Sequence, residues 1–255
     1  MNVTYQNPVQ YALSLSENIV QMNDLIGQEI TLQYQHQILC DICGRDTKKL
    51  FQGVCYPCFK SAPEASECIV FPERCKAQDG IGRDMDWETK NHLQDHIVYL
   101  SFTSGVKVGV TRASNNFTRW IDQGALNALV IAKTPNRYLA GCIEVSLKNH
   151  VHDKTFWKKM ITQTESNDVD LIEKRQILIK ELPEDLAQYA ATDTDVKDIQ
   201  YPVEFMPEKF KSVTFDKAEA LSGTLSGIKG QYLIFKEGLV FNVRRHAGYV
   251  AALIT

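Results

Sequence analysis

The sequence predicts a mixed α+β protein with a metal-binding segment in its first quarter. Three observations support this fold class. Four cysteines form two pairs of identical spacing, residues 96–151 alternate between strand-like and helix-like patterns, and both ends of the chain carry short alternating apolar runs. With 255 residues, of which 44% are apolar, the chain is long enough to bury a core in one large domain or several small ones.

The paired cysteines form the strongest motif in the chain. Two residues separate Cys40 from Cys43, two separate Cys55 from Cys58, and eleven lie between the pairs. This spacing can place four thiolates around one ion, so it predicts a structural zinc ribbon, which has no open position for chemistry. We do not expect a disulfide framework, because a chain of this length does not need such crosslinks.

A second zinc site is predicted from Cys68, Cys75, His92 and His96. The two histidines are four residues apart, which on one helical turn would place both imidazoles on the same face. A bound metal would also explain why the irregular segment between the two pairs folds into a closed loop. The alternative is that the cysteines pack in a core and the histidines lie on the surface.

The charge is unevenly distributed. The net charge is −3, which argues against a general nucleic-acid binder. Residues 101–160, however, carry nine Lys or Arg against three Asp or Glu, whereas residues 161–210 carry five against twelve. This separation predicts either one basic face or two segments that neutralise each other.

The location of the protein is predicted from what the sequence lacks. No apolar run reaches the roughly 18–20 residues that span a bilayer, and Met1–Tyr11 does not follow the pattern of an export signal. Seven cysteines fit a reducing compartment, where thiolates stay available to metal. We therefore expect a soluble cytoplasmic protein without a membrane partner.

Five segments follow from the pattern of predicted elements. Residues 96–102 and 106–112 form a hairpin, a short helix capped by Asn115 or Asn116 ends at Gly124, a strand follows, and Asn136 caps a longer helix. The segments are residues 1–38 (N-terminal strands that pair with the C-terminal module), 39–95 (zinc-binding, loop-like over 59–90), 96–160 (α/β domain), 161–198 (acidic linker and helix) and 199–255 (a β-rich module typical of a small barrel or sandwich).

The order hairpin, short helix, strand, longer helix resembles the GIY-YIG nuclease domain. Ile97-Val98-Tyr99 stands where that family has its first tripeptide, and Lys107-Val108-Gly109 stands where it has the second, with Lys107 in place of the tyrosine. Arg119 matches the family's helix arginine, and Glu144 matches its metal-binding glutamate. The resemblance implies a GIY-YIG-like α/β core and a metal-dependent endonuclease acting on DNA or RNA.

The chemistry of these residues fits phosphodiester hydrolysis. Glu144 could hold one Mg²⁺, and Tyr99 is the candidate base for the attacking water if Lys107 lowers its pKa. Arg119 offers a planar fork for phosphate oxygens. Each residue also has a structural explanation. Tyr99 suits a strand, Glu144 flanks a buried helix stripe, and Arg119 can pair with Trp120 or Asp122.

Two further observations concern the whole chain. It resembles an uncharacterised bacterial family in which a zinc ribbon precedes a KVGxTR segment and a GIKGQYL tail, which implies architecture and no activity. The C-terminal module interleaves cations with aromatic residues, a mixture that can bind nucleic acid or simply form a core: Lys229, Arg244 and Arg245 with Tyr232, Phe235 and Tyr249. The alternative to a nuclease is therefore a non-catalytic zinc-containing protein that binds RNA or DNA, and a third possibility is a scaffold without nucleic-acid affinity.

Overall fold

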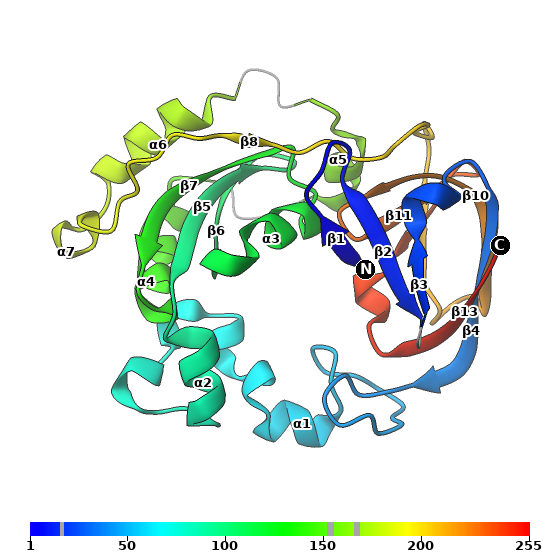
Figure 1. Ribbon diagram of the computed structural model, residues 1–255, viewed down its shortest axis with the longest axis horizontal. Coiled ribbons are helices and arrows are strands. Elements are labelled where there is room, and N and C mark those ends of the chain that lie inside the picture. The colour runs from blue at the N-terminus through cyan, green and yellow to red at the C-terminus, as the bar shows by residue number, and fades with distance from the viewer. Residues whose placement is uncertain (16–17, 152–155, 166–168) are drawn as a thin grey trace. The chain divides into compact units, whose positions relative to one another are not determined.

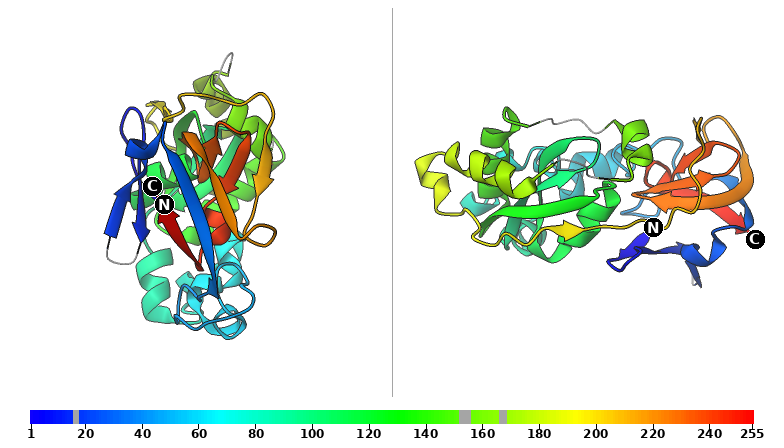
Figure 2. Two further views of the ribbon diagram at one scale, coloured as in Figure 1. Left: turned by 90° about the vertical axis from the view of Figure 1, so that its right-hand side faces the viewer. Right: turned by 90° about the horizontal axis from the view of Figure 1, so that it is seen from above.

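The computed structural model describes residues 1–15, 18–151, 156–165 and 169–255. The chain divides into two units, unit 1 with Met1–Lys60 and Ile199–Thr255 and unit 2 with Ser61–Asp198 (Figure 1, Figure 2). Helices occur together with several sheets, which confirms the mixed α+β class. Residues 166–168 of the predicted acidic linker lie outside the described residues.

Strands from both ends of the chain pair in unit 1. In a six-stranded sheet of order β13-β4-β10-β11-β12-β9, Leu32 of β4 is the register partner of Leu221 of β10 on one side and of Leu253 of β13 on the other. A separate three-stranded antiparallel sheet has the order β1-β2-β3. The strands are β1 (Asn2–Thr4), β2 (Gln10–Leu15), β3 (Asn18–Gln21), β4 (Glu29–Ile38), β9 (Lys211–Val213), β10 (Ala220–Lys229), β11 (Tyr232–Phe235), β12 (Leu239–Asn242) and β13 (Tyr249–Ile254).

The C-terminal strands form an open sheet. As the structure describes it, the six-stranded sheet ends in β9 on one side and β13 on the other, so it is not a closed barrel. Between these edges β10, β11 and β12 are antiparallel, and β9 pairs with β12 in parallel. The helical elements of unit 1 are the 3₁₀ helices η1 (Met22–Leu25) and η7 (Arg244–His246) and the short helix α1 (Tyr56–Ser61), which ends one residue beyond the unit boundary.

Unit 2 is built on an antiparallel sheet of order β6-β5-β7-β8. The predicted hairpin is confirmed, since β5 (His96–Phe102) and β6 (Val106–Arg112) pair along their whole lengths. Strand β7 (Asn127–Thr134) lies on the other side of β5, and β8 (Lys197–Asp198) is the far edge. Their order along the chain, with α3 (Asn116–Asp122) before β7 and α4 (Arg137–Lys148) after it, is the predicted one.

Helices cover both faces of this sheet (Figure 1). Val98 and Leu100 of β5 pack with α4 and α6 (Leu171–Lys180) in one core, whose other members include Leu129, Ile131, Ile143, Leu147 and Leu178. Tyr99 alternates with these residues, so it faces the opposite side, where its ring meets Trp120 of α3 edge-on with ring centroids 5.8 Å apart. The remaining helical elements are α2 (Met85–His92), α5 (Trp157–Thr162), α7 (Glu184–Ala187) and the 3₁₀ helices η2 (Pro63–Ala65), η3 (Glu67–Ile69), η4 (Pro72–Arg74), η5 (Ala77–Asp79) and η6 (Ala113–Asn115).

Side-chain caps explain where two of the helices begin. Asn136 accepts a 3.0 Å hydrogen bond from the amide of Leu139, which confirms the predicted N-cap of α4. The predicted cap at Asn115 is wrong, because its side chain makes no capping bond and the Asn116 amide oxygen binds the next amide instead. Residues 59–90, predicted to be loop-like, contain most of α2 and several 3₁₀ turns. Within the described residues, every helix is too short or too polar to cross a membrane.

Candidate metal centres and the Tyr99 cluster

Two tight turns bring the four cysteines of the first motif together. An isolated bridge joins Leu39 to Asp46 around the first pair, and another joins Phe51 to Val54 just before the second. The amide of Gly44 donates to the Cys40 carbonyl at 2.9 Å, and Gly44 adopts the positive φ that the turn requires. The four-cysteine segment, residues 40–60, is therefore shaped by local hydrogen bonds around the sulfurs.

The four sulfurs form a group that could hold a metal such as zinc. All ligand atoms lie within 4.8 Å of one another, and the sulfurs of Cys43 and Cys55 are 3.7 Å apart. Burial raises the pKa of Cys40, but hydrogen bonds from backbone amides, including that of Cys55, outweigh it and lower the value to about 6. A thiol with that pKa is largely ionised at neutral pH, which is the form that binds metal.

Three aromatic side chains, of which Tyr56 is exposed and Phe51 and Phe59 are half-buried, share the four-cysteine segment with several cations. The Phe51 ring contacts the rings of Tyr56 and Phe59, with centroids 5.5 and 5.7 Å away. Lys49 lies over Phe51 at 5.1 Å and Lys60 over Tyr56 at 6.0 Å. Tyr56 is 55% exposed, and four cations of this segment also face solvent: Arg45, Lys48, Lys49 and Lys60.

The second group of candidate ligands differs from the predicted one at one position. Cys68, Cys75 and His92 come together with Glu88, and all four ligand atoms lie within 4.8 Å of one another. The expectation that His92 and His96 share a helical turn is wrong, because α2 ends at His92 and His96 is the first residue of β5. His96 is buried, its Nδ1 is 2.7 Å from the Gln94 carbonyl oxygen, and burial lowers its pKa to about 4.

Tyr99, Arg119 and Glu144 lie close together in unit 2. The Tyr99 ring covers Gly109, its register partner on β6, where an added Cβ would be 2.6 Å from the hydroxyl. The Tyr99 hydroxyl donates to the Gln123 amide oxygen at 3.0 Å. Burial raises the pKa of Tyr99, while the charge and hydrogen bonding of Arg119 lower it and the charge of Glu144 raises it.

The surroundings of this cluster do not favour Tyr99 as a base. Its side chain is completely buried, and its raised pKa opposes ionisation at neutral pH. The Glu144 side chain is only 13% exposed, and one of its oxygens lies 3.8 Å from the ammonium of Lys148. Lys107 is half-buried on the same sheet face as Tyr99, two residue pairs further along the hairpin. In the described residues Glu144 belongs to no group of three metal-ligating side chains.

A cleft of about 520 Å³ lies beside Trp120, and neither Arg119 nor Glu144 lines it. Its polar lining comes mainly from Asp95, Lys133, Asp193, Asp195 and Lys197. The four residues that the GIY-YIG resemblance places at the catalytic site therefore do not open onto this cleft.

The comparison with protein families matches residues 27–251 to the family described as "Protein of unknown function (DUF2797)". The chain belongs to this family. A search of the curated proteins and a search of the solved structures each found no match.

For this DUF2797 member, sequence reasoning missed two features of the candidate sites. Glu88 was missed although it lies four residues before His92, the spacing that puts two side chains on one helix face. The aromatic and cationic side chains of the four-cysteine segment were also missed, although the C-terminal module carries a similar mixture that the sequence did indicate. There Phe235 is completely buried, and Lys229 is 3% exposed with its ammonium over the Tyr201 ring.

Proposed function

We propose that the chain is a zinc-containing protein that binds single-stranded nucleic acid through its four-cysteine segment. The observation that carries this proposal is the combination of one exposed ring, Tyr56, two half-buried rings and several exposed cations in the segment of the four thiols. The Phe51 ring contacts two other aromatic rings, and lysine ammonium groups lie over two of the three.

Zinc fits the four thiols by geometry and by chemistry. In a tetrahedral site with Zn–S bonds of about 2.3 Å, neighbouring sulfurs are about 3.8 Å apart. The Cys43 and Cys55 sulfurs are separated by 3.7 Å. Soft thiolates in a set of four favour zinc over magnesium or calcium, which prefer oxygen ligands. The ion would hold the two turns together and so fix the rings and lysines relative to each other.

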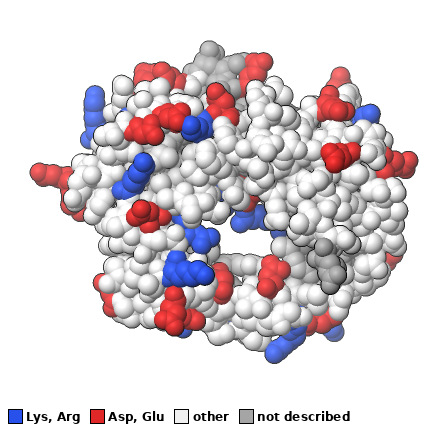
Figure 3. All heavy atoms as spheres, in the orientation of Figure 1, with Lys and Arg blue, Asp and Glu red and all other residues white. Residues whose placement is uncertain are grey.

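The side chains of this segment match the chemistry of a single strand. Unpaired bases stack on aromatic rings for about 1–3 kcal/mol per base, without much regard to sequence. Tyr56 is the ring most open to a base, since it is 55% exposed. The exposed lysines would meet phosphates, whose charge makes binding sensitive to salt. On the face that Figure 3 shows, Lys and Arg are interspersed with Asp and Glu in each unit, so a local site is a better fit than a broad basic field.

The test is binding of labelled single-stranded RNA and DNA to the full chain at several salt concentrations. We expect Tyr56→Ala to weaken binding about 5- to 150-fold, which corresponds to one lost stacking contact. Lys49→Gln with Lys60→Gln should reduce the slope of log K against log salt by about 1.4, for two phosphate contacts on a single strand. Tyr5→Ala is the matched control, because Tyr5 is exposed in the same unit but outside the four-cysteine segment.

Zinc is tested in the same assay. Loss of binding on treatment with a strong chelator, and its return on adding Zn²⁺, is the expected result. The proposal is wrong if Tyr56→Ala and the double lysine variant bind as tightly as the wild type, with the same salt dependence.

A second candidate function is a Mg²⁺-dependent phosphodiesterase centred on Tyr99, Lys107, Arg119 and Glu144. The observation that favours it is the proximity of Tyr99 to both Arg119 and Glu144. Glu144 would bind Mg²⁺ with one carboxylate, and Arg119 would bind phosphate. The complete burial of Tyr99 ranks this candidate below binding alone.

Cleavage assays separate the two candidates. If the second is correct, wild-type protein cuts a panel of single-stranded, duplex and branched DNA or structured RNA with Mg²⁺, and Glu144→Gln does not. Glu173→Gln on α6, where the side chain is exposed, serves as the control. Binding without cleavage by the wild type leaves the first proposal and removes the second.

A further inference from the structure

We propose that unit 2 contains a second zinc site, formed by Cys68, Cys75, Glu88 and His92. This site is separate from the four-cysteine segment, and it does not depend on the proposed nucleic-acid binding. Its four ligands come from η3, from the residue after η4, and from two successive turns of α2.

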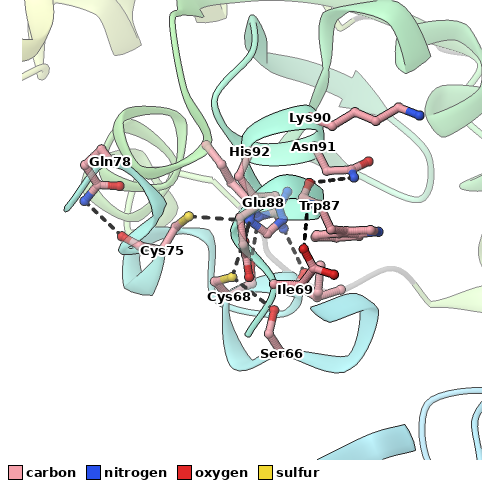
Figure 4. A network of polar contacts seen from close by, with 12 residues as sticks. Ser66, Cys68, Ile69, Cys75, Gln78, Trp87, Glu88, Lys90, Asn91 and His92 are labelled. Carbon is pink, nitrogen blue, oxygen red and sulfur yellow. Dashed lines mark hydrogen bonds and ion pairs between the residues drawn. The ribbon is translucent and has the colours of Figure 1, made fainter. Parts of the chain in front are cut away.

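The four side chains point at one position (Figure 4). His92 Nδ1 is 3.8 Å from the Cys68 sulfur and 3.6 Å from the Cys75 sulfur, and Glu88 Oε2 contacts the same nitrogen. In a tetrahedral site with Zn–S bonds of about 2.3 Å and Zn–N bonds of about 2.05 Å, a sulfur and a nitrogen are about 3.6 Å apart. The two sulfur–nitrogen distances are therefore those of a coordination shell.

Hydrogen bonds alone do not explain this arrangement. A histidine nitrogen carries at most one hydrogen, so Nδ1 can satisfy only one of the three groups that face it. The simplest alternative is a buried ion pair between Glu88 and His92 with two ordinary cysteines nearby. That alternative gives no reason for both sulfurs to approach the nitrogen, whereas a single ion would bind all four groups.

Burial strengthens the argument. Cys68 is 8% exposed and the other three residues are 2% exposed each, so water cannot solvate their charges. Two thiolates and one carboxylate with a neutral imidazole carry −3, and Zn²⁺ reduces this to −1. Arg137 offers the balancing positive charge next to the site, because its guanidinium donates to the carbonyl oxygens of Cys68 and Ile69 at 2.8 and 2.9 Å.

Neighbouring groups orient the ligands as outer partners of metal sites do. The Ser66 hydroxyl is 3.3 Å from the Cys68 sulfur, so it can donate to a thiolate. Trp87 meets the His92 ring edge-on with centroids 5.1 Å apart, which restricts the orientation of the imidazole. Asp84 caps α2 by accepting from the Trp87 amide at 3.0 Å, so the helix that carries both Glu88 and His92 begins at a defined point.

The site would hold an irregular loop in place. The buried apolar cluster of residues 68–77 consists of Cys68, Cys75 and Ala77, which is too small to order this loop by packing alone. The loop also docks on α4, where Gly141 has no side chain and lies against the backbone of Pro72 and Glu73. A buried set of four ligands is typical of a structural site, so the zinc would crosslink η3 and η4 to α2.

Metal analysis of the full chain tests the proposal. We expect two Zn per wild-type chain, one in Cys68→Ser/Cys75→Ser, and one in Cys40→Ser/Cys43→Ser. Cys142→Ser is the matched control in unit 2, because Cys142 lies on α4 outside both ligand groups, and it should keep two. A single Zn per wild-type chain that is unchanged in Cys68→Ser/Cys75→Ser would overturn the proposal. A metal other than zinc bound by Cys68, Cys75, Glu88 and His92 would overturn it as well.

A measurement on the wild type covers the case in which the variants do not fold. X-ray absorption at the zinc edge reports the mean coordination, which should be three sulfurs and one nitrogen or oxygen per zinc if the four-sulfur site and the mixed site are both filled. Four sulfurs per zinc would mean that only the four-cysteine segment binds. A disulfide between Cys68 and Cys75, read by mass spectrometry under native conditions, would also exclude the site.

Discussion

Replacing Gly141 by alanine tests how tightly the η3–η4 loop docks on α4. A methyl group at this position would lie 2.8 Å from the Cα of Glu73 and closer still to its amide nitrogen. Both atoms belong to the backbone, so the contact cannot be relieved by rotating a side chain. The loop must move as a whole, or the helix must.

Two effects of opposite sign determine the result. Alanine in a helix interior is about 1 kcal/mol more favourable than glycine, which stabilises α4. If the loop undocks, however, Arg137 loses its hydrogen bonds to the carbonyls of Cys68 and Ile69. Bonds from a charged donor contribute about 1.5–3 kcal/mol each, so we expect Gly141→Ala to lower the free energy of unfolding by about 2–5 kcal/mol.

Urea unfolding followed by tryptophan fluorescence measures this change in unit 2 alone. The three tryptophans of the chain, Trp87, Trp120 and Trp157, all lie in that unit. Gly105→Ala is the control, because no atom lies within 4 Å of its added Cβ and its φ is not positive, so its effect should stay within about 0.5 kcal/mol. If Gly141→Ala is instead more stable than the wild type by about 1 kcal/mol, the docking argument is refuted.

Two other variants test local features. Asn136→Ala should cost about 1 kcal/mol in unit 2 through loss of the α4 cap, whereas Asn115→Ala, which removes no capping bond, should be nearly neutral in the same urea assay. Burial lowers the pKa of Lys229 from 10.5 to about 8, so between these pH values the unfolded chain binds more protons and stability rises with pH. Lys229→Met should therefore be more stable than the wild type at pH 7, by up to about 3 kcal/mol, and the gap should close by about pH 10.5 in thermal unfolding followed by circular dichroism. A gap independent of pH would show that Lys229 is not the group responsible.

The elements that the sequence predicts well are those whose signal is local. The hairpin of β5 and β6 was predicted with its boundaries, because an apolar run over residues 96–102 and apolar alternation over residues 106–112 flank a short turn. The cap at Asn136 was predicted for the same reason. The cap predicted at Asn115 was wrong, because two adjacent asparagines offer the same chemistry and only the backbone conformation decides between them.

Exposure was the property that sequence reasoning could not supply. Aromatic and basic residues are interleaved in both the C-terminal module and the four-cysteine segment. In the first, Phe235 and Lys229 are buried by the pairing of β10 and β11 within a six-stranded sheet. In the second, tight turns around the sulfurs leave Tyr56 and Lys60 at the surface. The same composition therefore makes a core in one part of the chain and a candidate binding surface in another.

The second ligand set shows why a helix boundary matters for a metal site. Four residues before His92 lies Glu88, one turn earlier on the same helix face, and it contacts the imidazole. Four residues after His92 lies His96, but α2 has already ended and the chain has entered β5. Spacing alone treats both neighbours equally, so the sequence favours the histidine as the more usual zinc ligand. Only the end of the helix distinguishes the two neighbours, and it leaves the Glu88 carboxylate beside the imidazole. The structure therefore predicts a site with two sulfurs, one nitrogen and one oxygen, whereas the sequence suggested two sulfurs and two nitrogens.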